Sequence, residues 1–296
     1  MGACCSCQNQ INTDKNGEYV QGEDQENLKL NQQPKPKVQS INKECDNPDL
    51  IQKHAPPESI AKEITDLPDY HNDKVKESLD KLDDFIYDED EVEDKELPYL
   101  KPMIFQNGSG AVFTGQWKEG MKHGRGKQQW PDGSIYEGYW RNNMAEGKGR
   151  LIHSDGDVFI GRWREDKAHG KGKYLHLNGA TYEGDWQDDK QHGYGTETWQ
   201  DGAKFEGYYV DGKKHGQGKF IWSDGSKYEG NFVDNNIEGK GTYIWWDGRQ
   251  YTGDWKNNKM EGDGVFTWVD GRKYEGEYKD DKKHGYGVFY WPDQNH

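Results

Sequence analysis

The feature that most constrains this 296-residue chain is a motif that returns every 23 residues, eight times without an insertion or deletion. The eight units open on an aromatic residue, at Phe113, Tyr136, Phe159, Tyr182, Phe205, Tyr228, Tyr251 and Tyr274. A glycine follows each opening residue two positions later, and each unit carries a Gly-x-Gly pair farther on. A fixed period of this length indicates a repeat array in which every unit packs against its neighbours.

One unit has the pattern of a β-hairpin. From Tyr182 to Trp186, aromatic residues or glycine alternate with polar residues, and this period of two predicts a strand. The polar stretch Gln187 to His192 predicts a turn, Gly193 to Trp199 a second strand, and the Asp-Gly pair at 201–202 a second reversal. Eight such hairpins predict an all-β array of about sixteen antiparallel strands in chain order.

Aromatic residues and glycines share one parity on each predicted strand, so they lie on the same face of the sheet. A glycine in a strand leaves a hole that a cross-strand aromatic ring can fill, and this alternation predicts a curved sheet with an aromatic groove. Because no helix inside the array covers this face, we expect it to pack against itself or to bind a partner. The residues expected in this groove are Phe113, Trp117, Tyr136, Trp140, Phe159, Trp163, Tyr182, Trp186, Phe205, Tyr209, Tyr228, Phe232, Tyr251, Trp255, Tyr274 and Tyr278.

These units resemble the MORN (membrane occupation and recognition nexus) repeat, whose pattern is approximately Tyr-Glu-Gly-x-Trp-x-x-Gly-x-x-x-Gly-x-Gly followed by an Asp-Gly turn. The resemblance covers residues 113–296, and residues 97–112 look like a degenerate half-unit that caps the first edge with one strand. It implies an elongated single-layer β-meander that acts as an adaptor. Related arrays grip partner segments, self-associate and sit at membranes, the cell cortex or cilia, and some are reported to engage acidic phospholipids.

The N-terminus carries a lipidation signal in residues 1–7. Gly2 follows the initiator methionine and Ser6 stands at the expected place for N-myristoylation. One myristoyl chain binds membranes only weakly, so stable anchoring needs a second signal, and the thiols of Cys4, Cys5 and Cys7 are candidates for palmitoylation. The alternative is that these thiols are inert or bind a metal.

The rest of the N-terminal third is acidic and polar. Residues 1–112 contain 12 Lys, no Arg and 24 Asp or Glu, whereas residues 113–296 contain 27 Lys or Arg and 30 Asp or Glu. Residues 8–71 are predicted to be a disordered tether, and residues 88–96 an acidic linker. Between them, the spacing of Val75, Leu79, Leu82 and Ile86 predicts an amphipathic helix over 72–87, which either docks on a partner or on the array, or forms only transiently.

The composition also excludes several classes of function. The array is not basic, so nucleic acid is not an expected partner. The histidines at positions 123, 169, 192, 215 and 284 recur with the repeat beside a glycine, which indicates a structural role in each hairpin rather than catalysis or metal binding. The Gly-x-Gly pairs lack the Lys-Ser/Thr and helix of a phosphate-binding loop. We therefore expect no enzyme activity, no cofactor and no metal.

The sequence leaves several functions open. The first is a membrane-tethered scaffold, at the cytosolic face of the plasma or ciliary membrane, whose aromatic groove binds a protein partner. The second is a structural component of a ciliary or cortical cytoskeletal assembly, and a weaker third is a phosphoinositide-binding module, suggested by Lys-Lys turns such as Lys213-Lys214. In addition, the last strand, Val288, Phe289, Tyr290 and Trp291, has no segment expected behind it, and such an edge favours homodimerisation.

Overall fold

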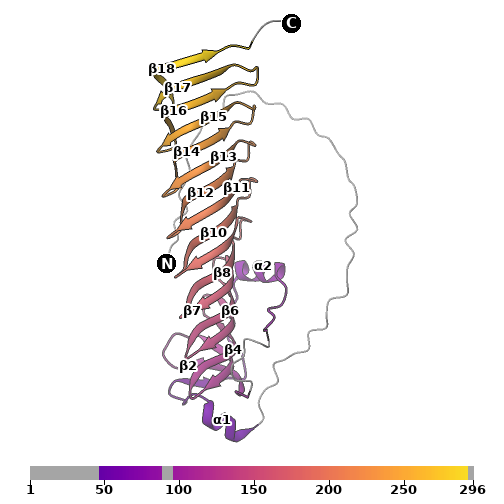
Figure 1. The fold of residues 1–296 in the computed structure, drawn as a ribbon. Helices are drawn as coiled ribbons and strands as arrows, with labels where there is room; N and C mark the ends of the chain where they lie inside the picture. Colours follow the sequence, from indigo (N-terminus) through magenta and orange to yellow (C-terminus); the bar gives the residue numbers. More distant parts are fainter. Residues whose placement is uncertain (1–46, 89–95, 293–296) are drawn as a thin grey trace, which may run out of the picture. The chain divides into compact units, whose positions relative to one another are not determined.

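The structure is a computed structural model that describes residues 47–88 and 96–292. It contains one antiparallel sheet of eighteen strands and two helices. Consecutive strands pair in chain order from β1 to β18, as the ladder of arrows in Figure 1 shows. The predicted all-β meander of hairpins is thus confirmed. The strands are β1 (Ala61–Glu63), β2 (Tyr99–Phe105), β3 (Val112–Lys118), β4 (Met121–Gln129), β5 (Ile135–Arg141), β6 (Met144–Ile152), β7 (Val158–Arg164), β8 (Lys167–Leu175), β9 (Thr181–Gln187), β10 (Lys190–Thr198), β11 (Lys204–Val210), β12 (Lys213–Ile221), β13 (Lys227–Val233), β14 (Asn236–Ile244), β15 (Gln250–Lys256), β16 (Lys259–Thr267), β17 (Lys273–Lys279) and β18 (Lys282–Tyr290).

Each unit forms its hairpin through a turn of two residues. In the fourth unit Asp188 and Asp189 have φ angles of 49° and 67°, the left-handed values that a hairpin turn of this kind requires. The chain returns to strand at Lys190, so the predicted turn from Gln187 to His192 was too long. The polar residues after the turn belong to β10. A β-bulge at Gly193 (φ 57°) then shifts the register in which β10 pairs with β9.

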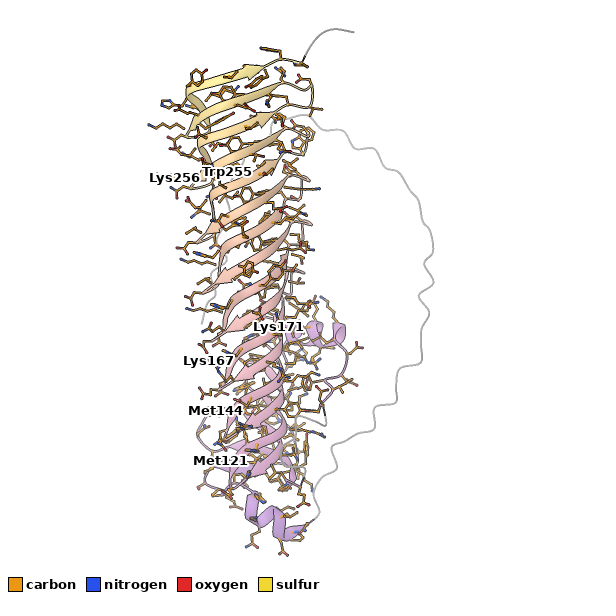
Figure 2. The ribbon with its side chains drawn as sticks, viewed as in Figure 1. Met121, Met144, Lys167, Lys171, Trp255 and Lys256 are labelled. Carbon is orange, nitrogen blue, oxygen red and sulfur yellow. The ribbon has the colours of Figure 1, made fainter. Side chains whose placement is uncertain are left out.

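The two-residue turns also join each unit to the previous one. Asn258 donates its backbone N–H to the carbonyl oxygen of Ile237 (3.1 Å), and its Oδ1 accepts from the N–H of Ile237 (2.7 Å). Five other units make the same pair of bonds through an Asn or Asp in this position, whereas Gly212 makes only the backbone bond. Met121, Met144 and Lys167, which begin β4, β6 and β8, mark the edge of the sheet along which these turns follow one another (Figure 2).

The N-terminal segment is more ordered than the sequence suggested. Residues 47–71 were assigned to a disordered tether, but α1 (Pro48–His54) begins there with Asn47 as its N-cap, and β1 pairs with β2. Ile51 and Ala55 pack against the cluster that includes Trp117. The prediction was wrong for these residues because the first edge of the array buries their few apolar side chains. The remainder of the predicted tether, residues 8–46, lies outside the described residues.

The second helix is shorter than predicted. The helix expected over 72–87 is α2 (Asp73–Lys81), capped by the side chain of Asn72, and the backbone is extended at Leu82. Val75, Leu79 and Leu82 pack on a cluster formed by Ile135, Ile152 and Val158 of β5, β6 and β7. Ile86 instead is 55% exposed. Because these strand residues alternate with the aromatic ones, α2 lies on the opposite face of the sheet from the aromatic rings.

Candidate partner-binding surfaces

The sixteen aromatic residues expected to line an open groove form the core of the sheet instead. Tyr136 packs edge-on against Trp140 of its own unit (4.9 Å between ring centroids) and against Trp163 of the next unit (5.2 Å). Equivalent edge-on pairs continue from Phe113 to Tyr278. Fifteen of the sixteen side chains are buried and Trp186 is half-buried. The rings cover one another, so they are not the surface that a partner would contact.

The glycines make this packing possible. A Cβ placed on Gly184 would lie 2.6 Å from the Cα of Gly195 on the neighbouring strand and 2.6 Å from the hydroxyl of Tyr182. The Tyr182 ring thus lies over the paired glycines, as the alternation of aromatic residues and glycine predicted. Its hydroxyl is not left unpaired, because it donates to the carbonyl oxygen of Asp185 (3.0 Å).

A second row of rings lies on the same face, and we call it the aromatic ladder; seven of its nine rings are half-exposed, Phe266 is buried and Trp291 is exposed. It runs through units 4 to 8, counted from Phe113, with consecutive centroids 4.5 to 5.4 Å apart. Repeat analysis missed it because five of these nine rings belong to the residue that immediately follows the second strand of its unit, outside the strands themselves. The ladder consists of Trp199, Phe220, Trp222, Tyr243, Trp245, Phe266, Trp268, Phe289 and Trp291.

Cationic and apolar side chains flank the ladder. The guanidinium groups of Arg249 and Arg272 lie 5.6 Å and 5.3 Å from the ring centroids of Trp245 and Trp268, within cation–π range. Trp246 in the adjoining turn is 69% exposed, and Trp291 at the end of the ladder is 68% exposed. Arg and Trp are enriched where proteins bind other proteins, so this combination is typical of an interaction surface.

The first unit holds a buried lysine at the corresponding edge. Lys122 is 9% exposed; its Nζ lies 3.6 Å from the Trp140 ring centroid and donates to Oε1 of Gln128 (2.6 Å). Burial lowers the pKa of Lys122 to about 7, with Asp166 opposing the shift. The side chain borders a hollow with Phe105 and Trp130. In unit 8 the equivalent Lys283 is exposed over the rings of Trp268 and Tyr274.

The opposite face of units 1 to 3 is covered by residues 70–88, which we call the strap, and we call this side of the sheet the strap face. The strap contacts the turns that connect one hairpin to the next. Tyr70 donates its hydroxyl to the carbonyl oxygen of Gly110, and Ser78 donates its hydroxyl to that of Gly156. Asn72 bridges two successive turns by donating to the carbonyl oxygens of Asp132 and Ser154, each at 2.9 Å. The strap therefore follows the repeat and contacts three neighbouring turns.

Charge holds the second part of the strap in place. Arg150 donates to the backbone carbonyl oxygen of Asp83 (2.7 Å), and Lys148 pairs with the carboxylate of Asp88 (2.9 Å). Arg150 also pairs with Glu137; burial by itself raises the pKa of Glu137, but Lys127 and Arg150 outweigh it and lower the pKa. Burial raises the pKa of Tyr87 well above its usual range, so its hydroxyl stays a hydrogen-bond donor.

The contacts described for the strap lie on units 1 to 3, and on the same face of units 5 to 8 the sheet is hollowed into an open trough. Glycines such as Gly241 and Gly264 line it, together with Glu229, Thr252 and Val265. Because glycine has no side chain, a ligand can approach the backbone of the sheet closely at these positions.

The recurring histidines have a structural role where their contacts are recorded. His123 Nδ1 accepts a hydrogen bond from the backbone N–H of Asn142 in the next turn (3.4 Å). Glutamate does the same in other units, since Glu238 accepts from Asn257 (2.8 Å) and Glu261 from Asp280 (3.0 Å). The bond is not made at every histidine, because Nδ1 of His169 and of His215 has no hydrogen bond among the residues that the structure describes and lies 3.7 Å and 4.0 Å from the carboxylates of Asp188 and Asp234. Within the described residues, no three His, Cys, Asp or Glu side chains gather as metal ligands.

The remaining predicted sites fall in different places. Gly2, Cys4, Cys5 and Cys7 lie outside the described residues, so the lipidation signal stays a prediction. Phe289 of the last strand belongs to the aromatic ladder, while Val288 and Tyr290 are 37% and 43% exposed. In the part of the chain that the structure describes, β18 pairs with β17 alone. Among residues 47–88 and 96–292, no helix has both the length and the apolar character needed to cross a bilayer.

Comparison with known proteins gives the family but little else. Solved structures are similar only at a low level. The TCP domain of Drosophila melanogaster SAS-4, in complex with a proline-rich motif of Ana2, is 16% identical over 53% of this chain and 85% of that chain, with a TM-score of 0.34. The G-box domain of the microcephaly protein CPAP is 11% identical over 65% and 99%, with a TM-score of 0.28. A search of curated proteins finds no match.

The family model of the MORN repeat matches the array unit by unit, and the matched segments together make up more than half of the chain. They are residues 113–135, 136–158, 159–181, 182–204, 205–227, 228–248, 251–271 and 274–296. These are the eight units that the 23-residue period predicted. The chain therefore belongs to the MORN repeat family and carries a repeat scaffold of eight units.

Proposed function

We propose that this chain is a non-enzymatic adaptor, tethered to the cytosolic face of a membrane by acyl chains on its N-terminus, which binds protein partners through units 4 to 8. The observation that carries the proposal is the difference between the two halves of the array. The strap occupies the strap face of units 1 to 3, whereas on the opposite face of units 4 to 8 most rings of the aromatic ladder are half-exposed and Arg249 and Arg272 flank them.

On the face of the sheet that carries the aromatic rings, we expect a partner to contact the ladder and not the buried rings. Its rings stack at interplanar angles of 31° to 51°, so their faces contact neighbouring rings along the row and their edges form an apolar stripe. A contiguous apolar stripe with a charged border fits a protein segment better than a small polar ligand.

Membrane attachment is tested by fractionation of cells that express the full chain. We expect the wild type in the membrane fraction, and Gly2→Ala in the soluble fraction because no acyl chain can be attached to alanine at this position in the signal. Replacement of Cys4, Cys5 and Cys7 by Ser is expected to release most of the protein, since one chain anchors weakly. Gly17→Ala is the matched control. Membrane retention of both variants would reject the tether.

Partner binding is tested with a labelling enzyme fused after His296, which leaves Gly2 free. The proteins labelled by the wild type are compared with those labelled by Trp222→Ala and by Trp245→Ala. We expect both variants to lose the same set of labelled proteins while remaining on the membrane. An unchanged set would show that the ladder is not the partner surface.

A second candidate function is a structural component of a ciliary or cortical assembly, and the open edge of β18 favours it. An uncovered strand edge can pair with another chain and so join a larger structure. Detergent extraction distinguishes the two candidates. A membrane adaptor is released by mild detergent, whereas an assembled component stays with the insoluble cytoskeleton.

A further inference from the structure

The strap contacts the middle of its face through Tyr87, and the residues around this ring form a small receptor. The ring packs edge-on against Tyr139, with centroids 5.5 Å apart at 82°. Its hydroxyl donates to the carbonyl oxygen of Gly126 (3.2 Å), and the guanidinium of Arg125 lies 5.9 Å from the ring centroid. Phe85 packs edge-on against Tyr87 at 5.0 Å. The strap thus presents two aromatic rings separated by one residue.

The same receptor positions recur three units later in the sequence. A shift of three 23-residue units moves Gly126 onto Gly195 and Tyr139 onto Tyr208, and places Tyr194 where Arg125 stands. Tyrosine occupies this position of the repeat only at 139 and 208. The other six units have Gln116, Arg162, Asp185, Asn231, Asp254 and Glu277 there. The recurrence is therefore a property of these two places and not of the repeat in general.

The later copy of the receptor is exposed. Tyr139 is 4% exposed beneath the strap, whereas Tyr194 and Tyr208 are 50% and 51% exposed. These two rings pack edge-on against each other, with centroids 5.4 Å apart at 78°. Aromatic rings pack favourably edge-on, and tyrosine is enriched at protein interfaces. Gln217, which lines the trough, follows Gly216, where a Cβ would lie 3.8 Å from the Cβ of Tyr208.

We propose that Tyr194 and Tyr208 form a second receptor, which takes from a protein partner an extended segment with two aromatic residues separated by one residue, as in Phe85-Ile86-Tyr87 of the strap. The inference rests on the proposed scaffold function and names the segment that one of its surfaces would recognise. Gly195 stands where the Gly126 carbonyl oxygen accepts the Tyr87 hydroxyl, so its carbonyl oxygen is the acceptor for the partner's tyrosine.

The charges around the second receptor are weaker than around the first. Lys148, which pairs with Asp88 of the strap, is replaced three units later by Gln217, and Arg150 is replaced by Lys219. A lysine lacks the planar fork with which Arg150 contacts both the backbone of Asp83 and the carboxylate of Glu137. Binding to the second receptor therefore depends mainly on the two aromatic rings of the partner segment. An acidic residue beside those rings adds less to binding than Asp88 adds in the strap.

The test uses the full chain and a fluorescent peptide with the sequence of residues 82–88, and binding is followed by fluorescence anisotropy. We expect saturable binding to the wild type, with Tyr194→Ala and Tyr208→Ala each at least about tenfold weaker because an edge-on ring contact and its buried area are lost. Tyr286→Ala is the matched control, since Tyr286 occupies the repeat position of Tyr194 four units later and is 77% exposed. A peptide with Phe85→Ala and Tyr87→Ala is expected not to bind.

Several outcomes would overturn the inference. One is a wild type that shows no saturable binding. Another is binding that Tyr139→Ala abolishes while Tyr208→Ala leaves it unchanged, because the peptide would then be replacing the strap. A third is a full chain that dimerises by itself through Tyr208, since the occupant would then be a second copy. If the peptide does not bind but membrane attachment and partner labelling are intact, the second receptor is rejected and the scaffold function is not. If the peptide binds but the protein neither attaches to membranes nor labels partners, the scaffold function is rejected and the second receptor is not.

Discussion

The indole nitrogen of Trp255 donates a hydrogen bond to the carbonyl oxygen of Gly241, 3.1 Å away, while its ring packs edge-on against Tyr228 in the preceding unit. The same Trp-to-Gly bond recurs at Trp140 and Trp186. One residue thus satisfies its own polar group and joins two units. Gly241 is required because a side chain at this position would occupy the space of the Tyr228 ring.

Replacement of such a glycine should destabilise the array strongly. A Cβ on Gly241 would lie 2.5 Å from Cζ of Tyr228, so we expect Gly241→Ala to lower the free energy of unfolding by about 3 kcal/mol or more. Gly225→Ala is the control: this glycine has a φ of 88° but nothing within 4 Å, and its replacement should cost only about 1 kcal/mol. Urea unfolding measures both. Equal losses would mean that backbone conformation alone, and not ring packing, requires the glycines.

The turn that joins unit 5 to unit 4 should allow a substitution that raises the stability of the array. Gly212 lacks the side chain with which Asn258 caps the N–H of Ile237, although its φ is also positive (80°, against 64° at Asn258) and the space around it is open. We expect Gly212→Asn to add a bond to the N–H of Gln191 and to stabilise the array by about 0.5–1 kcal/mol. Hydrogen exchange at the Gln191 amide should slow. Asn258→Ala is the converse variant and should cost about 1 kcal/mol; faster Gln191 exchange in Gly212→Asn would contradict the account.

Lys122 should make stability depend on pH. Its pKa is lowered to about 7 in the fold, against about 10.5 when unfolded, so the buried charge destabilises the protein fully below pH 7 and progressively less as the pH rises toward 10.5. Lys122→Met should therefore stabilise most below pH 7, by roughly 2–4 kcal/mol, and little above pH 10.5. Lys283→Met, at the exposed equivalent position, is the control. A gain that does not change with pH would assign the effect to packing.

The last strand should support self-association. Within the described residues β17 is the one strand that pairs with β18, and Val288 and Tyr290 on β18 are exposed. We predict a homodimer formed by pairing of β18 edges, and expect Val288→Pro to weaken it because proline removes a backbone donor. Light scattering after size exclusion gives the mass. A monomeric wild type at high concentration contradicts the prediction, as does a dimer that Val288→Pro leaves intact.

The sequence predicted the repeated parts of the fold better than the single ones. The period and the alternation of Tyr182, Gly184 and Trp186 were sufficient for the hairpins and for ring-over-glycine packing, because eight copies carry the same signal. Residues 47–71 were misjudged, since their apolar side chains are few and become buried only against the array. The Asn47-Pro48 start of α1 was a local signal that could have identified it.

The candidate surfaces were predicted less well than the fold. The alternation of side chains along each strand placed the large rings on one face. It does not distinguish an exposed ring from one that the ring of the next unit covers, as Trp163 covers Tyr136. The aromatic ladder depends on residues just outside the strands, and the strap on contacts between residues far apart in the chain. The spacing of Val75, Leu79 and Leu82 indicated an apolar helix but not the face of the sheet on which it packs.

The central claim is that partners bind units 4 to 8 while the strap occupies units 1 to 3. Photo-cross-linking tests it most directly, with a photoreactive phenylalanine in place of Trp246 beside the ladder or of Tyr139 beneath the strap, in cells and with the N-terminus intact. We expect cross-links to other proteins from position 246, and from position 139 only cross-links to residues 70–88 of the same chain. Cross-links to other proteins from position 139 but not from position 246 would contradict it.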